Sequence, residues 1–497
     1  MRRMRATPGT WWVIGSLAAA TLALRAAQRR RSSSPSSSPL GATSRAGRNA
    51  EMARLGARVG GSAASNRARW LFASAERKEE LNAQLELRTA EDIAGTLGNM
   101  KGALMKVGQL ASFVDDGMPE PVRQALAQLQ ADAPPMSPDL AAGVVRDELG
   151  APPETLFAEW DPVPIAAASI GQVHRALTKD GRAVAVKVQY PGVDEAIRSD
   201  LDGFDTAMSP AGLLYKNFDV APFIEEIRER IGEELDYRVE AANQRLFADY
   251  YRGHPFIEVP DVVDELSTGR VLTTDLAVGA RFSEVESWSQ AERDLAGEAI
   301  IRFVYRSLYR LQAFNGDPHP GNYLFRPSGR VTFLDFGLVK QYSDDEADQM
   351  MDLAQNMVIK PDLAGARGAA ERAGYYPAGA PVSDQEIWDF SITFWEMVQK
   401  DELFRFTPEY ASEVARRFLL GRATHGDAVK YANMPARWVI LQRINVGLIA
   451  ILGRLQAEAN WHRIALEMWP ATGAGPSTPL GHEEAAWWAA TQAMRGT

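Results

Sequence analysis

Residues 316–322 read GDPHPGN and residues 334–337 read LDFG, and these two stretches decide which fold we expect. In the first stretch, Asp317 and Asn322 stand five residues apart. In the second, Asp335 follows the run RVTFL, whose β-branched and apolar residues predict a strand. The chain therefore presents a carboxylate, an amide and a second carboxylate, in that order, around a predicted strand.

These are the chemical groups that phosphoryl transfer needs. One carboxylate lies near the attacking oxygen, and a second carboxylate and an amide hold magnesium against the phosphates of ATP. We expect Asp317 in the first role and Asn322 and Asp335 as the metal ligands. Their order and spacing are those of the catalytic loop and the metal-binding tripeptide of protein kinases. A turn rich in Gly, Pro and Asp, with no catalytic role, is the alternative.

The composition of the chain excludes several kinds of site. There is no cysteine among the 497 residues, which excludes disulfides, zinc–thiolate sites, iron–sulfur clusters and thiol nucleophiles. The six histidines are scattered, without a pair at metal-ligand spacing on a helix. Any bound metal is therefore expected to be a hard cation held by oxygen. A chain of this length is expected to form more than one folded unit, two or three in all.

Charge is divided unevenly along the chain. Residues 1–75 carry 13 arginines, no lysine and one acid, a net charge of +12. The rest of the chain has 41 basic and 63 acidic residues, a net charge of −22. The body is therefore a poor candidate for binding nucleic acid, and only the basic tail could attract polyanions.

The amino-terminal segment, residues 1–31, predicts a membrane anchor. Nineteen uncharged residues lie between Arg5 and Arg25, and as a helix they would span about 28 Å, near the thickness of a bilayer core. More arginines follow this run than precede it, which places the body on the cytoplasmic side. Arginine outnumbers lysine by 44 to 10, which suggests a GC-rich genome and therefore a bacterial source. The membrane we favour is accordingly the bacterial inner membrane. A mitochondrial or plastid presequence and a secretory signal peptide are the alternatives.

The region after residue 161 carries the features of a nucleotide-binding lobe. Residues 165–173, IAAASIGQV, stand where a kinase has its glycine-rich loop, and only Gly171 remains of the usual glycines. The run AVAVKV at 183–188 predicts the strand that carries the ATP-binding lysine, here Lys187. The candidate nucleotide contacts in the loop are Ala166, Ala167, Ala168, Ser169, Gly171 and Val173.

Three further elements surround this lobe. A helix from about residue 219 to 247 carries Glu226, the candidate for the ion pair that orients the ATP-binding lysine; a solvated helix charge is the alternative. The run VLTTDL at 271–276 predicts a buried strand that leads to a hinge at Gly279, where adenine would stack. Apolar residues at helical spacing from 291 to 314 then lead into the catalytic loop.

Taken together, five motifs resemble those of the UbiB/AarF family of atypical kinases. They are KVGQ at 106–109, AAASIGQVH at 166–174, ELD at 234–236, GDPHPGN at 316–322 and LDFG at 334–337. The resemblance covers about residues 90–345, with all the motifs in the order of the family. The chain has no Ala-Pro-Glu tripeptide after LDFG, which departs from the pattern of ordinary protein kinases.

The resemblance implies an α+β, two-lobed protein-kinase-like fold, with a small β-rich lobe, a helical lobe and a helical extension over the active site. In that fold Lys106, accompanied by Gln109, points into the nucleotide site, and Glu234 and Asp236 hold it. The implied cofactors are ATP or ADP with Mg²⁺. The implied partners are a nucleotide, a membrane lipid or an isoprenoid-quinone precursor, and lipid-biosynthetic enzymes.

The domains expected on this basis are a membrane anchor or targeting segment, a flexible linker, the helical extension, the two lobes and a tail. Their ranges are 1–31, 32–75, 76–160, 161–280, 281–470 and 471–497. The apolar run at 438–452 is interrupted by Arg443 and Asn445, so it predicts a buried helix and not a second membrane span. For Trp487 and Trp488 in the tail, docking on the body and docking on lipid are both open.

Three functions are compatible with these features. An ATP- and magnesium-dependent phosphotransferase or ATPase in isoprenoid-quinone or membrane-lipid metabolism is favoured. A nucleotide-binding pseudokinase scaffold for lipid-biosynthetic enzymes and a protein kinase acting in trans are the alternatives. The extension that carries Lys106 argues against a peptide substrate, and the presence of all the catalytic groups gives no reason to infer an inactive protein.

Overall fold

The computed structural model of the chain describes residues 136–168, 170–194, 232, 235–316, 318–424, 431–432 and 435–495. The predicted membrane anchor, the linker and most of the helical extension lie outside these ranges. So do six of the predicted site residues: Lys106, Gln109, Ser169, Glu226, Glu234 and Asp317.

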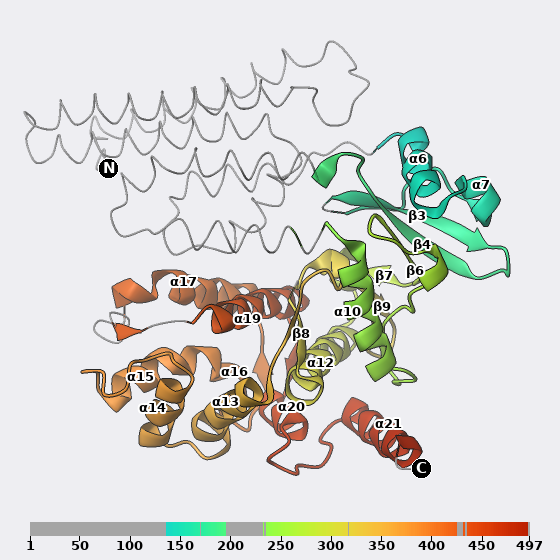
Figure 1. Cartoon of the computed structure of the whole chain (residues 1–497). Helices are drawn as coiled ribbons and strands as arrows, with labels where there is room; N and C mark the ends of the chain where they lie inside the picture. Colours follow the sequence, from blue (N-terminus) through green and yellow to red (C-terminus); the bar gives the residue numbers. More distant parts are fainter. Residues whose placement is uncertain are drawn as a thin grey trace, which may run out of the picture.

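A five-stranded antiparallel sheet forms the first part of the described fold, at the upper right of Figure 1. Its strands are β1 (Phe157–Trp160), β2 (Ala166–Ala167), β3 (Gly171–Thr178), β4 (Ala183–Gln189) and β6 (Val271–Asp275). The order is β1-β3-β4-β6, with β2 paired to the start of β3. Helix α6 (Pro138–Leu149) packs against β4 and β6, and the short α7 (Pro153–Leu156) leads into β1.

The alternation along β4 explains how the sheet aims its functional lysine. Val184, Val186 and Val188 are fully buried, as the pattern AVAVKV predicts. Because successive side chains of a strand point to opposite faces, Lys187 projects from the other face of the sheet. That face is approached by α10 (Tyr237–Tyr250), which packs against β6.

Helix α10 begins at Tyr237, with Asp236 as its N-terminal cap. The prediction of one continuous helix over residues 219–247 is therefore wrong at residue 236. Asp236 has an extended backbone, with φ −117° and ψ 100°, and its side chain accepts a hydrogen bond from the N–H of Arg238. An aspartate in this position satisfies a free N–H of the first turn and starts a helix. A single helix therefore does not run through residue 236 as predicted.

A second sheet connects the two parts of the fold. It has the order β5-β10-β9-β7, from β5 (Ile257–Glu258), β7 (Ala280–Arg281), β9 (Tyr323–Arg326) and β10 (Arg330–Phe333). Strand β10 confirms the strand predicted before Asp335. Strand β8 (Ala313–Asn315) pairs with β11 (Val339–Gln341), which brings together the chain segments on either side of the two motifs.

The central helix α12 (Gln290–Arg306) continues into the π-helical turn η2 (Ser307–Leu311). Gln312, with φ 54°, ends this turn, so that residues 313–315 form β8 and not the end of the predicted helix over 291–314. The core packs around α12. Phe303 stacks on Phe333 with ring centroids 3.7 Å apart.

The remaining part of the described chain is mostly helical, as the resemblance implies for the second lobe (Figure 1). Its elements are α13 (Asp344–Ala354), η4 (Gln355–Ile359), α14 (Leu363–Arg372), α15 (Asp384–Ser391), η5 (Ile392–Phe394), α16 (Glu396–Gln399), β12 (Phe404–Arg405), α17 (Pro408–Thr424), α19 (Ala436–Leu455), β13 (Glu458–Ala459), α20 (Trp461–Met468) and α21 (Pro479–Arg495). The short elements α11 (Phe282–Val285), η1 (Asp264–Leu266) and η3 (Pro320–Asn322) complete the set.

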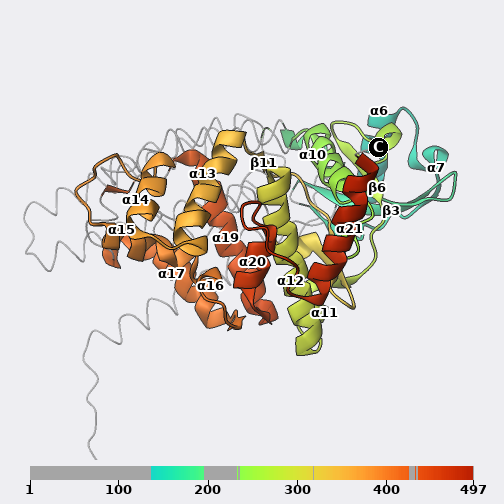
Figure 2. The same cartoon turned by 90° about the horizontal axis from the view of Figure 1, so that it is seen from below.

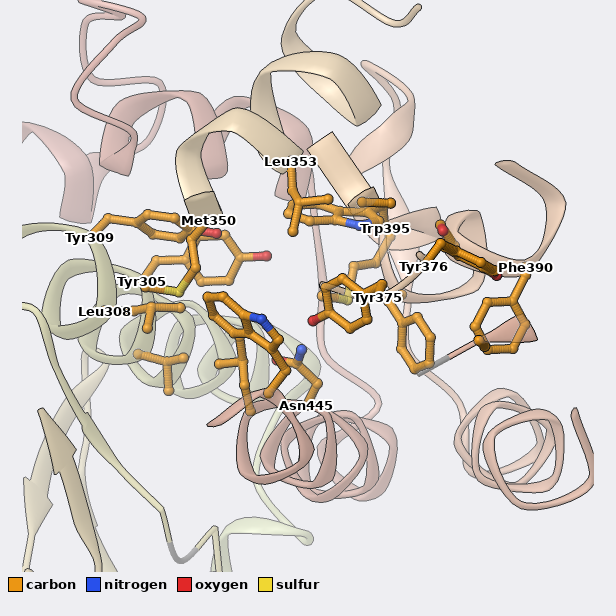
Figure 3. A pocket seen from close by; sticks show the side chains of 18 residues that line it. Tyr305, Leu308, Tyr309, Met350, Leu353, Tyr375, Tyr376, Phe390, Trp395 and Asn445 are labelled. Carbon is orange, nitrogen blue, oxygen red and sulfur yellow. The ribbon is translucent and has the colours of Figure 1, made fainter. Parts of the chain in front are cut away.

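Helix α19 confirms the buried helix predicted over 438–452. Trp438, Leu448 and Leu452 are at most 1% exposed. No helix within the described ranges combines the length and the apolar character that crossing a bilayer demands. Together with α12, η2 and α13–α16, α19 also encloses a cavity whose walls are largely aromatic (Figure 3).

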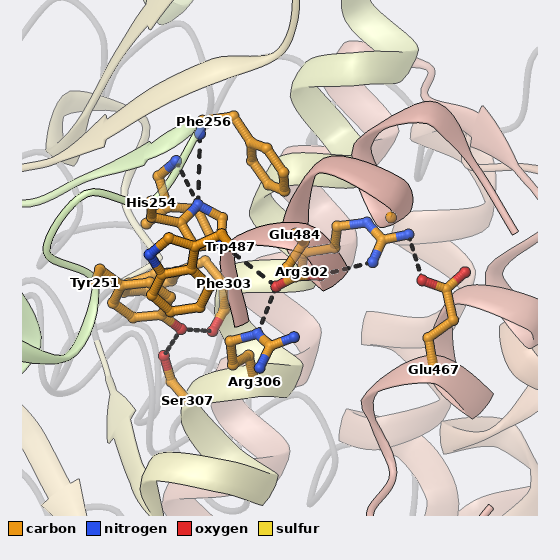
Figure 4. A network of polar contacts seen from close by, with 12 residues as sticks. Tyr251, His254, Phe256, Arg302, Phe303, Arg306, Ser307, Glu467, Glu484 and Trp487 are labelled. Carbon is orange, nitrogen blue, oxygen red and sulfur yellow. Dashed lines mark hydrogen bonds and ion pairs between the residues drawn. The ribbon is translucent and has the colours of Figure 1, made fainter. Parts of the chain in front are cut away.

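The carboxyl-terminal helix α21 packs on the body beside α12 (Figure 2), which answers the question left open for the tail. Glu484 of α21 is 1% exposed, and its carboxylate contacts the guanidinium groups of Arg302 and Arg306 on α12 (Figure 4). The ring of Trp487 lies 4.5 Å from that of His254, and Trp488 lies over Arg306 at 5.1 Å. These contacts fasten the tail to the body through buried charges and aromatic rings.

Candidate active site

An ion pair between β4 and α10 forms the centre of the candidate site. The Nζ atom of Lys187 donates hydrogen bonds to both carboxylate oxygens of Glu240, at 2.7 and 2.8 Å. The side chains are only 17% and 7% exposed. A buried charge pair with two hydrogen bonds holds the ammonium group in one place.

Asp335 lies on the other side of Lys187. Its Oδ2 atom is 3.7 Å from Nζ of Lys187, and its Oδ1 atom accepts a hydrogen bond from the N–H of Gly337 at 2.9 Å. The side-chain amide of Asn315 donates to the carbonyl of Asp335 at 2.6 Å. The backbone of the LDFG motif is thus anchored, while its carboxylate is directed toward the lysine.

The surroundings keep Lys187 charged. Burial alone would lower the pKa of the lysine, but the negative charges of Asp335 and Glu240 outweigh it and hold the pKa well above its usual value. The ring of Tyr237 adds a favourable contact, since Nζ lies 5.0 Å from its centroid. The site therefore presents a fixed positive charge at neutral pH, which suits the phosphates of a nucleotide.

Phe336 joins α10 to the LDFG motif. Its side chain is fully buried and lies 4.9 Å from the ring of Phe247 on α10. The side-chain amide of Asn243, also on α10, donates to the carbonyl of Phe336 at 3.1 Å. One helix thus positions both Glu240 and the motif that carries Asp335. This is the arrangement that kinases need for productive binding of ATP.

Asn322 and Asp335 lie at the same end of a β-hairpin. Residues 323–326 and 330–333 pair in antiparallel register, with Tyr323 opposite Phe333, and the N–H of Leu334 donates to the carbonyl of Asn322 at 3.0 Å. The residues that flank the paired strands are therefore neighbours. An amide and a carboxylate that is 32% exposed provide oxygen ligands of the kind that Mg²⁺ prefers, so these residues fit the predicted metal.

The Ala-rich loop forms the hairpin of β2 and β3 beside the lysine. Val173 pairs with Lys187 across β3 and β4, and the N–H of Ala168 donates to the carbonyl of Gly171 at 2.9 Å. Ala166 and Ala167 are exposed. A Cβ atom at Gly171 would lie 2.3 Å from the carbonyl oxygen of Val188, which explains why this glycine remains.

Two polar residues of the same motif have a structural role. Gln172 and His174 are at most 1% exposed, and their side chains contact each other at 2.9 Å. The side chain of Gln172 also accepts from the N–H of Met136, and that of His174 contacts the carbonyl of Asp161. These contacts tie the loop hairpin to Met136 before α6 and to Asp161 after β1.

The structure brings together Lys187, Asn322 and Asp335 as predicted neighbours, and it adds Glu240, which the sequence analysis missed. The predicted partner Glu226 lies outside the described residues, as does Asp317. Asp236 caps α10, and its predicted contact with Lys106 remains a prediction. The sequence feature that could have identified Glu240 is Asp236. An aspartate at this position can cap a helix, and a helix that starts there has Glu240 in its first turn.

Comparisons with known proteins agree with this geometry. Residues 128–367 match the model of the ABC1 atypical kinase-like domain. The rat atypical kinase COQ8B, named as mitochondrial, is 33% identical over 268 residues, which are 54% of this chain and 51% of that protein. The yeast atypical kinase COQ8, also named as mitochondrial, is 31% identical over 285 residues, 57% of each chain.

The chain belongs to the ABC1 (UbiB/AarF) family of atypical kinases. The Arabidopsis chloroplastic protein ACTIVITY OF BC1 COMPLEX KINASE 1 is 32% identical over 313 residues, 61% of this chain and 46% of that protein. The match spans about half the length of these curated relatives.

A solved structure matches more of the chain. It is the complex of Rv3197 with erythromycin from Mycobacterium tuberculosis, with 33% identity and a TM-score of 0.57. The match covers 80% of this chain and 99% of that one. The fold is therefore kinase-like, with mixed helices and sheets.

Proposed function

We propose that this ABC1-family protein binds ATP with magnesium and acts as an atypical kinase or ATPase in isoprenoid-quinone or membrane-lipid metabolism. The observation that carries the proposal is the contact of Lys187 with both Glu240 and Asp335. A lysine held between two carboxylates binds the α- and β-phosphates as a point charge, and its neighbour Asp335 can reach a metal ion on the same phosphates.

Each residue has a separate task in this proposal. Lys187 binds the phosphates, and Glu240 keeps it oriented and charged. Asn322 and Asp335 would hold the magnesium ion, which when bound supplies positive charge to the phosphate oxygens. Asp317 orients the attacking water or hydroxyl group, and Lys106, held by Glu234 and Asp236, points into the nucleotide site.

The lipid part of the proposal depends on the family. The motifs of the chain resemble a family that supports ubiquinone and prenyl-lipid metabolism at membranes, and the apolar segment within residues 1–31 suits such a location. The rat, yeast and Arabidopsis relatives are named as mitochondrial or chloroplastic, which supports the organellar alternative to a bacterial inner membrane. Fractionation of cells into membrane and soluble parts tests the location.

Hydrolysis of ATP by the full chain tests the activity. We expect magnesium-dependent turnover in the natural protein, and a loss of at least about a hundredfold in Asp335→Asn, since the metal would lose a charged ligand. Asp345→Asn on α13 is the matched control, because Asp345 is exposed and outside the site. Equal turnover in all three proteins would exclude the assignment. Nucleotide binding without turnover would favour the pseudokinase scaffold.

A cell-based measurement tests the metabolic role separately. Cells without the gene should lose isoprenoid quinone, and the natural chain should restore it while Asp335→Asn should not. If quinone and membrane lipids stay unchanged in the deleted strain while the purified protein hydrolyses ATP, the catalytic assignment stands and the metabolic role is wrong.

A further inference from the structure

One face of helix α10 carries polar side chains where a helix that packs on a core usually has apolar ones. Four residues at positions i, i+3, i+4 and i+7 share this face: Glu240, Asn243, Gln244 and Phe247. Glu240 and Gln244 are at most 6% exposed, and Asn243 is partly buried. A buried polar side chain needs a hydrogen-bond partner, so the partners indicate which segments this face holds in place.

The three polar side chains on this face bind three different segments of the chain. Glu240 accepts hydrogen bonds from the lysine of β4. The Nδ2 atom of Asn243 donates to the carbonyl of Phe336 in the LDFG motif, at 3.1 Å. The Nε2 atom of Gln244 donates to the carbonyl of Pro260, which follows β5, at 2.7 Å. Two of these contacts therefore reach the candidate active site, and the contact of Asn243 is the one that reaches the metal-binding motif.

The carbonyl that Asn243 holds belongs to a peptide group that also contacts the metal-binding carboxylate. The carbonyl of Phe336 and the N–H of Gly337 are the two polar ends of one peptide group. The N–H end donates to Oδ1 of Asp335 at 2.9 Å. Because a peptide group is planar, fixing the direction of its carbonyl also fixes the direction of its N–H. Asn243 therefore acts on Asp335 through a single rigid group.

The orientation of this carboxylate decides which of its oxygens faces the lysine. Oδ1 of Asp335 is held by the peptide group, and Oδ2 lies 3.7 Å from Nζ of Lys187. The terminal bond of an aspartate side chain rotates over a broad range, so the carboxylate has no strong preference of its own. The bond from Gly337 supplies that preference. The bond from Asn243 strengthens it, because a carbonyl that accepts a hydrogen bond makes the N–H of its peptide group a stronger donor.

We propose that Asn243 is a positioning residue for the metal site. Through the peptide group after Phe336, it fixes the Asp335 carboxylate in the orientation that binds Mg²⁺. The inference rests on the proposed magnesium–nucleotide binding, and it adds a residue that lies outside all five sequence motifs. Asn243 stands about one turn after Glu240 on the same helix. One rigid element therefore holds both the metal-binding carboxylate and the glutamate that orients the lysine.

Hydrogen exchange of the Gly337 amide in the nucleotide-free full chain tests the geometry without any ligand. Asn243→Leu keeps the approximate size of the side chain and removes the donor, so the peptide group loses one of its two bonds. We expect the Gly337 amide to exchange about fivefold to tenfold faster in this variant, the effect of losing one hydrogen bond. Unchanged exchange in a folded Asn243→Leu protein would refute the action through the peptide group.

Gln244→Met is the matched control on the same helix. It removes an amide donor whose partner, the carbonyl of Pro260, lies outside the LDFG motif. Because Gln244 is only 1% exposed, this variant should lower the midpoint of thermal unfolding at least as much as Asn243→Leu does. It should nevertheless leave the exchange of the Gly337 amide unchanged. If both variants speed that exchange equally, the effect is a general loss of stability and the proposal is wrong.

Calorimetry of ATP binding with and without Mg²⁺ tests the consequence for the site. In Asn243→Leu, the factor by which Mg²⁺ raises the affinity for ATP should fall about fivefold. The affinity without Mg²⁺ should stay within about twofold, because Lys187 and Glu240 keep their contact, whereas a merely structural role would weaken both.

The natural chain separates the two ways in which this inference can fail. If Mg²⁺ does not raise the ATP affinity of the natural chain, the proposed function and this inference are wrong together. If Mg²⁺ raises it by the same factor in the natural chain and in Asn243→Leu, the proposed function stands and only the role of Asn243 is refuted.

Discussion

Replacing Glu484 by glutamine should loosen the carboxyl-terminal helix from the body. Its carboxylate lies 2.8 Å from Nη1 of Arg302 and also binds Arg306, and Arg302 is fully buried. Burial alone would raise the pKa of Glu484, but the contact with His254 Nε2 at 3.5 Å and the charges of Arg306 and Arg302 outweigh it and lower the pKa to about 2. Glutamine would leave two buried guanidinium groups short of a negative charge.

The pKa gives the magnitude of the effect and its sign. A shift from 4.5 to about 2 corresponds to about 3 kcal/mol of stabilisation by the ionised carboxylate. Because the pKa is lower in the folded protein, this contribution is fully present above the unfolded value of 4.5 and is lost as the pH falls toward 2. Burial also lowers the pKa of His254, which favours unfolding below its usual value of 6.5.

Hydrogen exchange of the amides in α21 measures this stabilisation locally. At pH 7, Glu484→Gln should raise the opening equilibrium of the helix by roughly a hundredfold, which corresponds to about 3 kcal/mol. Glu483→Gln is the matched control, because Glu483 is the neighbour of Glu484 in the chain and its side chain is exposed. This variant should change the free energy of opening by no more than about 0.5 kcal/mol. Equal exchange in the two variants would refute the reasoning.

Three further substitutions test the candidate site. Glu240→Gln should weaken ATP binding about tenfold in calorimetry, because Lys187 loses the carboxylate that orients it and keeps its pKa high; unchanged affinity would mean that the pair is only structural. Gly171→Ala should destabilise the first sheet by about 1–3 kcal/mol in thermal unfolding, since its Cβ would lie 2.3 Å from the carbonyl oxygen of a β4 residue, and a fully stable variant would contradict this contact. Gly447→Ala should lower ATP turnover by about a hundredfold while the protein stays folded, because its Cβ would lie 2.5 Å from Cγ of Pro318 in the predicted catalytic loop; full turnover would show that the loop tolerates the shift.

Local patterns were enough to predict part of the site. The alternation of valines in β4 predicted the strand that carries Lys187, and the LDFG motif with its preceding strand predicted the place of Asp335. The apolar run with Arg443 predicted the buried helix α19, because a charge within the run is unfavourable in a bilayer. These features depend on the periodicity of short segments.

Pairings between distant segments could not be predicted in the same way. Lys187 and Glu240 are 53 residues apart, and the predicted helix over 219–247 ran through Asp236, so the first turn of α10 was not recognised. Arg302 and Glu484 are 182 residues apart, and their pairing depends on how α21 returns to α12. The domain boundaries, the helical extension with Lys106 and the cofactors remain predictions.

The binding of ATP with and without Mg²⁺ to the natural chain and to Asp335→Asn tests the central claim most directly. If Lys187, Glu240 and Asp335 form one magnesium–nucleotide site, Mg²⁺ should increase the affinity of the natural protein for ATP at least about tenfold. Asp335→Asn should lose this increase and keep the weaker, magnesium-free binding through Lys187. An equal increase by Mg²⁺ in both proteins would contradict the account.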